Sequence, residues 1–354
     1  AGHLAGRHED RLRQQLRRAQ TMAIVASLLG IGVTAAGAAT NSGSLAGAGG
    51  AIAAGGGDAA LRGLLAYKRS EEVTADRSAL KYLRKTKQSP RGMIRTFERF
   101  ASALSLSGSR TDPYRLSHPL PRERIANLSV VAKKSPYYDK TDSASLQQRH
   151  DMARAKIAAY TQGPSAVSRL FRNNRSSVAA KYGDAISTYL YGNPRAALKK
   201  IDSLLKAAPK NPYFHELRGD ILIKANRADQ AAKAYARATR LDPNRTGLLQ
   251  AGYGHALVAS GKQANLKKAV GVLKKAINSD RENPASYRLL AQAQGRLGNI
   301  PEAELATAES HFYSGKFQEA KIFATRAQLK MKRGSPGWLR ASDIIEFKLP
   351  KKKK

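Results

Sequence analysis

Apolar side chains recur at three- and four-residue intervals along much of this chain, which is the pattern of amphipathic helices. The clearest stripe lies in residues 90–103, where Met93, Ile94, Phe97 and Phe100 share one helix face. Such a stripe is typical of a packed core. The same analysis predicts a mainly α fold with further helices over residues 3–20, 70–86, 122–133 and 145–160.

From residue 177 the helical pattern becomes periodic. Residues 212–243 place small, aromatic and helix-ending residues where a 34-residue tetratricopeptide repeat has them. These are Gly219, Ala231, Tyr235, Ala238 and Pro243. Because small residues let paired helices approach closely, we predict an α-solenoid over residues 177–345. The flanking units carry Ala185, Ala197, Ile201 and Pro209 before it, then Gly254, Ala269, Leu273 and Ala276, then Tyr287 to Ala308, and finally Ala320, Ala324 and Ala327.

A long uncharged stretch precedes these elements. Residues 22–40 contain no charge and have about the length that spans a bilayer. The next apolar stretch, residues 45–66, is rich in glycine and contains Asp58 and Arg62, which are costly at the centre of a membrane. We therefore interpret residues 22–66 as a mobile apolar hairpin that covers a cleft or touches a membrane surface.

The charge balance indicates anionic partners. The chain has 62 Lys and Arg against 26 Asp and Glu, a formal net charge of +36. Such a surface attracts polyanions, which in a cell envelope are anionic lipids or lipopolysaccharide, and elsewhere nucleic acid. The chain has no Cys, which excludes thiol catalysis, thiolate zinc sites and disulfides.

Two short segments resemble the motifs of a gluzincin zinc protease. Ala1-Gly2-His3 resembles the end of His-Glu-x-x-His, in which two His ligands share one helix face and the Glu acts as general base. Glu72 and Asp76 stand four residues apart, as in the second gluzincin motif, and can face the same site. Taken alone, Glu72 and Asp76 fit an ordinary amphipathic helix with two exposed acids better, and a Gly-His start without its partner His and Glu is no stronger as evidence. His8 does not complete a three-His zinc site, because the third His of that motif would fall at residue 9.

The surrounding sequence resembles the BepA-like bacterial zinc metalloproteases, which are relatives of the membrane protease HtpX and carry C-terminal tetratricopeptide repeats. The resemblance rests on four stretches spread over nearly the whole chain in the family's order. They are Gly2 to His8, Glu72 to Asp76, Ser117-His118-Pro119-Leu120-Pro121-x-x-Arg124, and the repeats.

The resemblance implies a zinc site. His3 and Glu72 are expected to bind the metal, and Asp76 to hydrogen-bond a ligand His and fix its ring. The first His ligand and the general-base Glu are expected before Ala1, so that this chain is an N-terminally truncated fragment. His118 is expected near the open coordination position or a substrate oxyanion, although its neighbouring prolines equally favour a plain turn.

A zinc site shared by His3 and Glu72 limits how often the hairpin between them can cross a membrane. If His3 and Glu72 bind one zinc, the chain crosses a membrane an even number of times between them, so one span is excluded. A transmembrane hairpin, as in the HtpX-like relatives, remains the alternative to a cover.

The expected organisation is a partial, helical gluzincin domain (residues 1–135), a connector (136–176), the repeat solenoid (177–345) and a basic tail (346–354). We expect a zinc endopeptidase that acts on cell-envelope proteins in quality control or outer-membrane assembly. It would be periplasmic and membrane-associated, with repeats that bind substrates or assembly partners and with nucleic acid disfavoured. The alternative is a non-catalytic basic repeat scaffold that binds acidic proteins or anionic envelope components.

Overall fold

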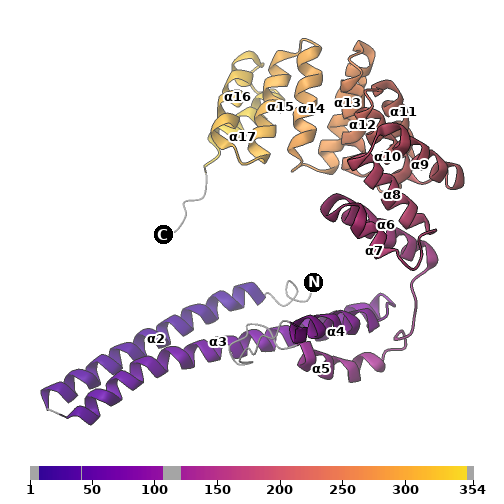
Figure 1. The fold of residues 1–354 in the computed structure, drawn as a ribbon. Coiled ribbons are helices and arrows are strands. Elements are labelled where there is room, and N and C mark those ends of the chain that lie inside the picture. The colour runs from indigo at the N-terminus through magenta and orange to yellow at the C-terminus, as the bar shows by residue number, and fades with distance from the viewer. Residues whose placement is uncertain (1–7, 41, 107–120, 349–354) are drawn as a thin grey trace. The chain divides into compact units, whose positions relative to one another are not determined.

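The structure is a computed structural model that describes residues 8–40, 42–106 and 121–348. All regular secondary structure in these ranges is helical, which confirms the mainly α fold (Figure 1). The chain divides into two compact units, Ala1–Ser143 and Ala144–Lys354. The first unit contains α2 (His8–Ala39), α3 (Gly43–Lys85), α4 (Arg91–Leu106) and α5 (Pro121–Lys133).

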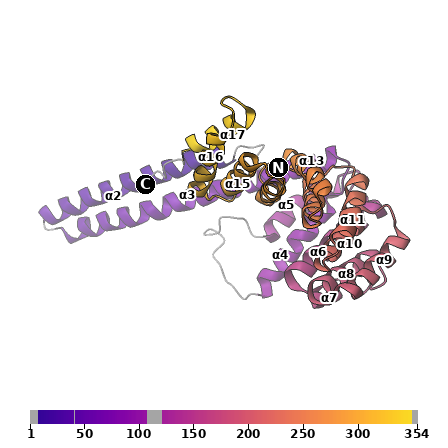
Figure 2. The ribbon, with the colours of Figure 1, turned by 90° about the horizontal axis from the view of Figure 1, so that it is seen from above.

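The first unit begins with a long helical hairpin. Helices α2 and α3 pack on one another along most of their length and lie side by side in both views (Figures 1 and 2). The predicted apolar hairpin is the distal part of this pair. The predicted helix boundaries here were wrong, because α2 continues past Gln20 and α3 begins well before Ser70. Residues 21–69 contain no proline that would stop a helix, and their many alanines favour continuation of the helices.

A small core holds the second half of α3 in place. It joins Leu80 of α3, Ile94 and Phe97 of α4, and Leu128 and Ala132 of α5. The stripe predicted in residues 90–103 is therefore core at two of its positions. Phe100 lies mostly exposed.

The loop after α5 is tied back to the turn between α3 and α4. The Ser89 hydroxyl donates to the carbonyl of Tyr138, and the Lys140 ammonium donates to the carbonyl of Lys87 at 2.7 Å. These contacts hold α3, α4 and α5 as one body, so one face of the second half of α3 is buried against its neighbours.

The second unit is a stack of helix pairs, which confirms the predicted repeat solenoid. Each helix packs on its sequence neighbour, and each pair on the next. Residues 144–170 of the predicted connector form two helices that belong to this unit, and their Met152, Ala155 and Val167 enter the core of the first repeat helices. The helices are α6 (Ala144–Gln162), α7 (Pro164–Leu170), α8 (Val178–Tyr191), α9 (Pro194–Ala207), α10 (Pro212–Lys224), α11 (Ala228–Leu241), α12 (Gly247–Ala259), α13 (Gln263–Ser279), α14 (Pro284–Arg296), α15 (Ile300–Tyr313), α16 (Phe317–Lys330) and α17 (Pro336–Glu346).

Local sequence sets where these helices begin. Helices α9, α10 and α14 each start at an Asn-Pro pair, in which the Asn side chain accepts a hydrogen bond from a backbone N–H of the first turn. Pro at the first helical position has its φ angle preset and lacks an N–H that would be unpaired there. The three caps are Asn193, Asn211 and Asn283.

The predicted small residues lie where the helices touch. Ala197, Ala231, Ala238 and Ala269 are completely buried, as are the alanines of the last helix pair. Each occupies a position at which a longer side chain would push two helices apart. The repeat pattern therefore located the packing contacts of the solenoid correctly.

Tyr235 is enclosed by two glycines of neighbouring helices. A Cβ atom placed on Gly219 of α10 or on Gly252 of α12 would lie 2.5 Å or 2.4 Å from the Tyr235 ring. The Tyr235 hydroxyl donates to the Asp220 carboxylate. Burial raises the pKa of Asp220 to about 6, although the hydrogen bond from Tyr235 by itself lowers it. Gly219 was predicted as a small position, whereas Gly252 was not noticed.

We expect Gly252→Ala to destabilise the repeat unit by about 1–3 kcal/mol, because the ring cannot move away from backbone on both sides. Gly271→Ala is the matched control, since Gly271 also lies within a helix but has no atom within 4 Å of the added Cβ. There the change should stabilise by up to about 1 kcal/mol through helix propensity. Urea denaturation of both variants measures the difference, and equal effects would contradict the enclosure of Tyr235.

Candidate functional site

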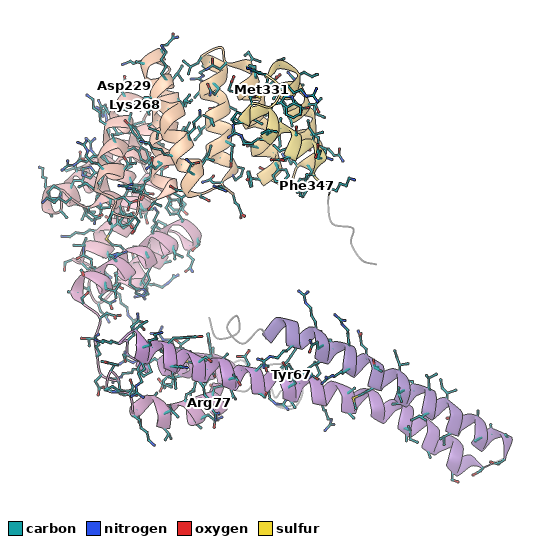
Figure 3. The ribbon with its side chains drawn as sticks, turned by 180° about the vertical axis from the view of Figure 1, so that it is seen from behind. Tyr67, Arg77, Asp229, Lys268, Met331 and Phe347 are labelled. Carbon is teal, nitrogen blue, oxygen red and sulfur yellow. The ribbon has the colours of Figure 1, made fainter. Side chains whose placement is uncertain are left out.

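Helix α3 carries three buried acidic side chains in its second half. Glu71, Glu72 and Asp76 are 9%, 7% and 4% exposed, in a stretch of α3 that Tyr67 and Arg77 bracket in Figure 3. A buried carboxylate is unfavourable unless a cation or several donors compensate it. The partners of these three groups therefore define the site.

Arg124 of α5 compensates two of them. Its Nε donates to Asp76 Oδ2 at 2.8 Å and its Nη2 to Asp76 Oδ1 at 2.6 Å, which is a bidentate pair. The same Nη2 lies 3.3 Å from Glu72 Oε2. Glu72 and Asp76 thus face one side of α3, as their spacing predicted, and one guanidinium bridges them.

Aromatic packing holds the guanidinium in place. Its central carbon lies 4.2 Å from the centroid of the Phe97 ring, at cation–π distance. Burial by itself lowers the pKa of Arg124, but its hydrogen bonds to Asp76 and the negative charges of Asp76 and Glu72 outweigh this effect, so the pKa is raised. Arg124 is a permanent cation at this point of the fold.

Glu71 has a separate partner on α2. Its Oε2 lies 3.1 Å from Arg11 Nη2, and this ion pair ties the base of the hairpin together. The Tyr67 hydroxyl is buried beside it and has no hydrogen-bond partner among the described residues. Burial, followed by the charge of Glu71, raises the pKa of Tyr67. Neighbouring acids on one helix thus have different environments, because they face different helices.

The sequence-predicted site residues are only partly described by the structure. Glu72 and Asp76 lie together, whereas His3 and His118 lie outside the described residues. Both oxygens of Asp76 accept from Arg124, and the predicted hydrogen bond from a ligand His is not among its described contacts. Within the ranges that the structure describes, no three His, Asp or Glu side chains are close enough to hold a metal ion.

The donor chemistry at Glu72 fits a zinc ligand. A carboxylate oxygen is an ordinary zinc donor. Asp76 takes the short, bidentate contacts of Arg124, and Glu72 takes only the longer one at 3.3 Å. Of the two acids, Glu72 therefore has the weaker contact with Arg124, and Asp76 is the one that holds the Arg124 guanidinium in position.

Sequence reasoning missed two residues of this site. Arg124 was noticed as part of a motif but received no role, and Glu71 was not considered. The sequence did indicate a role for Arg124, because two acids on one buried helix face need a nearby cation to compensate their charge. The signal for Glu71 was absent, because its burial depends on how α2 packs.

Two family models match separate parts of the chain. Residues 1–132 match peptidase family M48, and residues 201–307 match the cytochrome c-type biogenesis protein H TPR domain. The first match contains Glu72, Asp76 and Arg124. The second lies within the helix pairs of the second unit.

Curated relatives match over most of the chain. The beta-barrel assembly-enhancing protease of Escherichia coli (strain K12) is 25% identical over 77% of this chain and 56% of its own length. The protein of the same name from Yersinia pestis is 26% identical over 78% and 56%. The putative beta-barrel assembly-enhancing protease of Vibrio cholerae is 27% identical over 78% and 57%. The chain thus spans a little over half the length of these relatives.

Among solved structures, MamA MSR-1 C2 is similar with a TM-score of 0.39 and 15% identity, covering 49% of this chain and 99% of that one. The TPR domain of P58(IPK) is similar with a TM-score of 0.23 and 13% identity, covering 95% and 98%.

Proposed function

We propose that this chain, which joins an M48 peptidase segment to a tetratricopeptide repeat domain and is homologous to the beta-barrel assembly-enhancing proteases, is part of a zinc-dependent endopeptidase. The observation that carries the proposal is the buried Glu72–Arg124–Asp76 arrangement. It lies inside the segment that matches the peptidase family.

The residues of this chain then have distinct roles. His3 and Glu72 hold the zinc ion, which when bound polarises the scissile carbonyl and activates a water molecule. Asp76 fixes Arg124 by its bidentate pair, and Arg124 in turn orients the Glu72 carboxylate. His118 approaches the open position or the substrate oxyanion.

The substrates we propose are cell-envelope proteins, and the location is the periplasm. This follows from the beta-barrel assembly named in the relatives. The repeats bind substrates or assembly partners, because stacked helix pairs present an extended surface for other chains.

The charge of the repeats favours a second candidate, a non-catalytic scaffold for acidic partners. Arg227, Lys233, Arg237 and Arg240 are exposed on or beside α11, and none forms an ion pair with a described residue. Lys224, at the end of the neighbouring α10, is instead engaged within the protein and donates to the carbonyls of Tyr189 and Leu190. Four cations without partners on one repeat are available to an acidic protein.

Metal analysis of the complete gene product distinguishes the two candidates. We expect one zinc per chain, cleavage of an unfolded protein substrate, and loss of cleavage on chelation that added zinc restores. A product without stoichiometric zinc or chelator-sensitive cleavage, but with salt-sensitive binding to acidic proteins, would establish the scaffold instead.

A further inference from the structure

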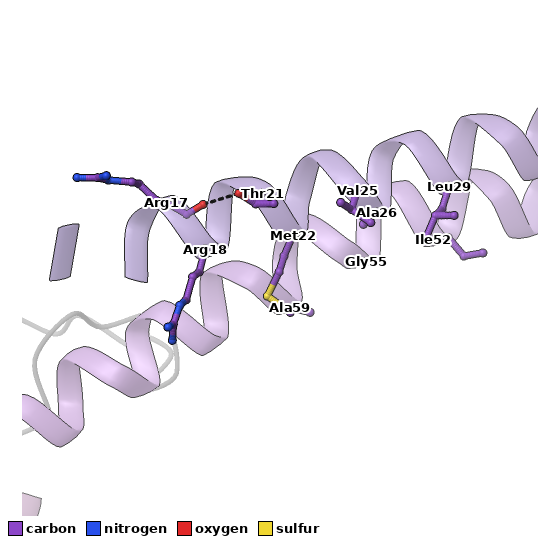
Figure 4. A pocket seen from close by; sticks show the side chains of 10 residues that line it. All are labelled: Arg17, Arg18, Thr21, Met22, Val25, Ala26, Leu29, Ile52, Gly55 and Ala59. Atoms are coloured by element: carbon purple, nitrogen blue, oxygen red, sulfur yellow. Dashed lines mark hydrogen bonds between the residues drawn. The ribbon is translucent and has the colours of Figure 1, made fainter. Parts of the chain in front are cut away.

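Two of the larger grooves in the described residues differ in chemistry. One, of about 820 Å³, runs along the α2/α3 hairpin between Met22, Val25 and Leu29 of α2 and Ile52 of α3, and it is apolar except at one end (Figure 4). The other, of about 740 Å³, lies within the second unit and combines apolar, amide and cationic side chains. Of the two, the second has the polar groups that select a ligand.

Helix α6, which precedes the predicted repeats, forms one wall of this second groove. Met152 and Ala155 hold it there, because they are buried in the same core as α8. The opposite wall consists of Tyr182 of α8, residues 211–213 at the start of α10 and residues 243–244 before α12. No single repeat contains both walls, so the repeat pattern alone does not show this groove. We call it the α6 groove.

The charged side chains that line the α6 groove are all basic and all come from α6. They are Arg149 and Lys156, and no Asp or Glu lines it. Lys156 donates to Glu216 of α10 at 3.0 Å, so its charge is compensated within the protein. Arg149 is exposed and forms no ion pair with a described residue. The α6 wall therefore offers an uncompensated cation to a bound molecule.

Two more exposed cations stand beside the groove. Lys210 and Arg245 each adjoin a residue of the opposite wall in sequence, and neither forms an ion pair with a described residue. The acids nearest in sequence are already engaged, since Asp242 accepts from two backbone N–H groups and Asp151 pairs with Arg154 at 3.1 Å. The potential around the groove is therefore positive, which suits an acidic ligand.

The opposite wall is uncharged and presents rings. Tyr182 is 2% exposed and packs on Phe214 with 5.5 Å between the ring centroids, so its ring is fixed. Tyr213 and Pro212 are half-buried beside it, and Pro243 completes the wall. Rings that are already held in place contact apolar side chains of a ligand at a small cost in conformational entropy.

Asn211 adds a hydrogen-bond donor to this wall. Its Oδ1 accepts from the backbone N–H of Tyr213 at 3.0 Å, which caps α10 and fixes the side chain. The described contact of its Nδ2 is with the Met152 sulfur at 3.8 Å, and a thioether is a weak acceptor. A carboxylate or carbonyl oxygen of a bound chain would be a better partner for this N–H group.

The exposed face of α6 extends the groove along the helix. Five exposed residues on it are spaced alternately four and three apart, so they share one side of the helix. The last two, Ile157 and Tyr160, are 61% and 45% exposed. The face is about 21 Å long, which is the length of about six residues of an extended chain. The five residues are Leu146, His150, Ala153, Ile157 and Tyr160.

We propose that the α6 groove binds an extended segment of a substrate or partner protein in which acidic residues alternate with apolar ones. The proposal rests on the part of the proposed function in which the repeats bind other proteins. Because successive side chains of an extended chain point to opposite sides, the acidic ones can face Arg149 while the apolar ones face Tyr182 and Tyr213.

Peptide binding to the full chain, measured by fluorescence anisotropy, tests the proposal. The probe is a labelled peptide that alternates Asp with Leu and Tyr, and its two counterparts have Asn or Lys in place of Asp. We expect the Asn peptide to bind about tenfold more weakly, the effect of losing one charge-assisted contact, and the Lys peptide to show no measurable binding. Equal binding of the Asp and Asn peptides would overturn the preference for acidic segments.

Charge variants locate the binding. Arg149→Glu should weaken binding of the Asp peptide about tenfold or more, whereas Arg172→Glu should change it less than about twofold. Arg172 is the matched control, because it is exposed in the same unit and does not line the groove. Equal losses in the two variants would mean that net charge, and not the groove, holds the peptide.

A bulky substitution tests the space in the groove. The indole of Ala153→Trp would occupy the groove, so binding of the Asp peptide should fall more than about tenfold. Ala264→Trp is the matched control, because Ala264 is an exposed alanine of α13 outside the groove. Thermal midpoints by circular dichroism show that both variants are folded. Unchanged binding in folded Ala153→Trp would overturn the assignment of the site.

Lipid headgroups are the competing ligand. Binding of phosphatidylglycerol vesicles that Arg149→Glu and Ala153→Trp both abolish, without peptide binding, would assign the groove to lipid and overturn the proposal. Peptide binding by chelated protein that shows no zinc-dependent cleavage would overturn the proposed endopeptidase alone. Zinc-dependent cleavage without peptide binding would overturn the α6 groove alone.

Discussion

Replacing Arg124 by Met is expected to destabilise the packing of α3, α4 and α5 by about 3–5 kcal/mol, because it leaves buried carboxylates without their cation. Asp76 loses both of its hydrogen bonds and Glu72 its contact at 3.3 Å. The contact with Phe97 contributes about 0.5–2 kcal/mol more, which Met replaces only in part. A loss of this size is comparable to the whole stability of a small helical unit.

Hydrogen exchange of the α3–α5 amides measures this change separately from the repeats. Arg122→Met is the matched control, because Arg122 lies on the same helix with its side chain exposed. Arg124→Lys should recover part of the loss, since it restores the charge but not the fork that binds Asp76. Similar protection in Arg124→Met and Arg122→Met would show that the ion pair contributes little to the fold.

Replacing Glu72 by Gln in the complete gene product is expected to lower proteolysis more than about 100-fold, beyond the range typical of losing an outer partner of a metal ligand. The amide keeps the volume of the side chain but removes the charge that a zinc ligand supplies. The pair between Arg124 and Asp76 remains, so the fold should survive. Zinc content and cleavage rate are measured together with the thermal midpoint.

Glu71→Gln is the internal control for this change. Glu71 precedes Glu72 and is similarly buried, but its partner is Arg11 of α2 and not Arg124. Loss of the Glu71 charge should weaken the packing at the base of the hairpin. Zinc content and cleavage rate should stay within about threefold of the unmodified protein, which is well below the effect of losing a hydrogen-bond partner of a metal ligand. Equal losses of zinc in both variants would show that zinc binding depends on any buried carboxylate of α3, and that Glu72 is not a specific ligand.

The repeats were predictable from sequence for a local reason. A helix pair of this type needs small residues at its crossing points, and their spacing lies within about 34 residues of sequence. Ala197, Ala231 and Ala269 lie completely buried at the predicted positions. Gly252 escaped because its role depends on a ring from the preceding helix pair, and no spacing within its own repeat shows that contact.

The hairpin was less predictable in its boundaries. Alanine and glycine carry little hydrophobic pattern, so neither the end of α2 nor the start of α3 has a periodic signal. The absence of proline predicts the long helices α2 and α3 better than the change from polar to alanine- and glycine-rich sequence does. The lack of charge from Ala19 to Gly57 was visible, but which apolar side chains remain exposed was not.

The sequence by itself determined the helical class of this protein, the register of its repeats and the shared face of Glu72 and Asp76, because each follows from spacing along one helix. Only the tertiary structure decided which acid is bound to which cation. Arg124 lies 48 residues from Asp76 in the chain, and Arg11 lies 60 from Glu71. Those pairs depend on how α2, α3 and α5 pack, and burial makes them strong enough to distinguish three neighbouring carboxylates.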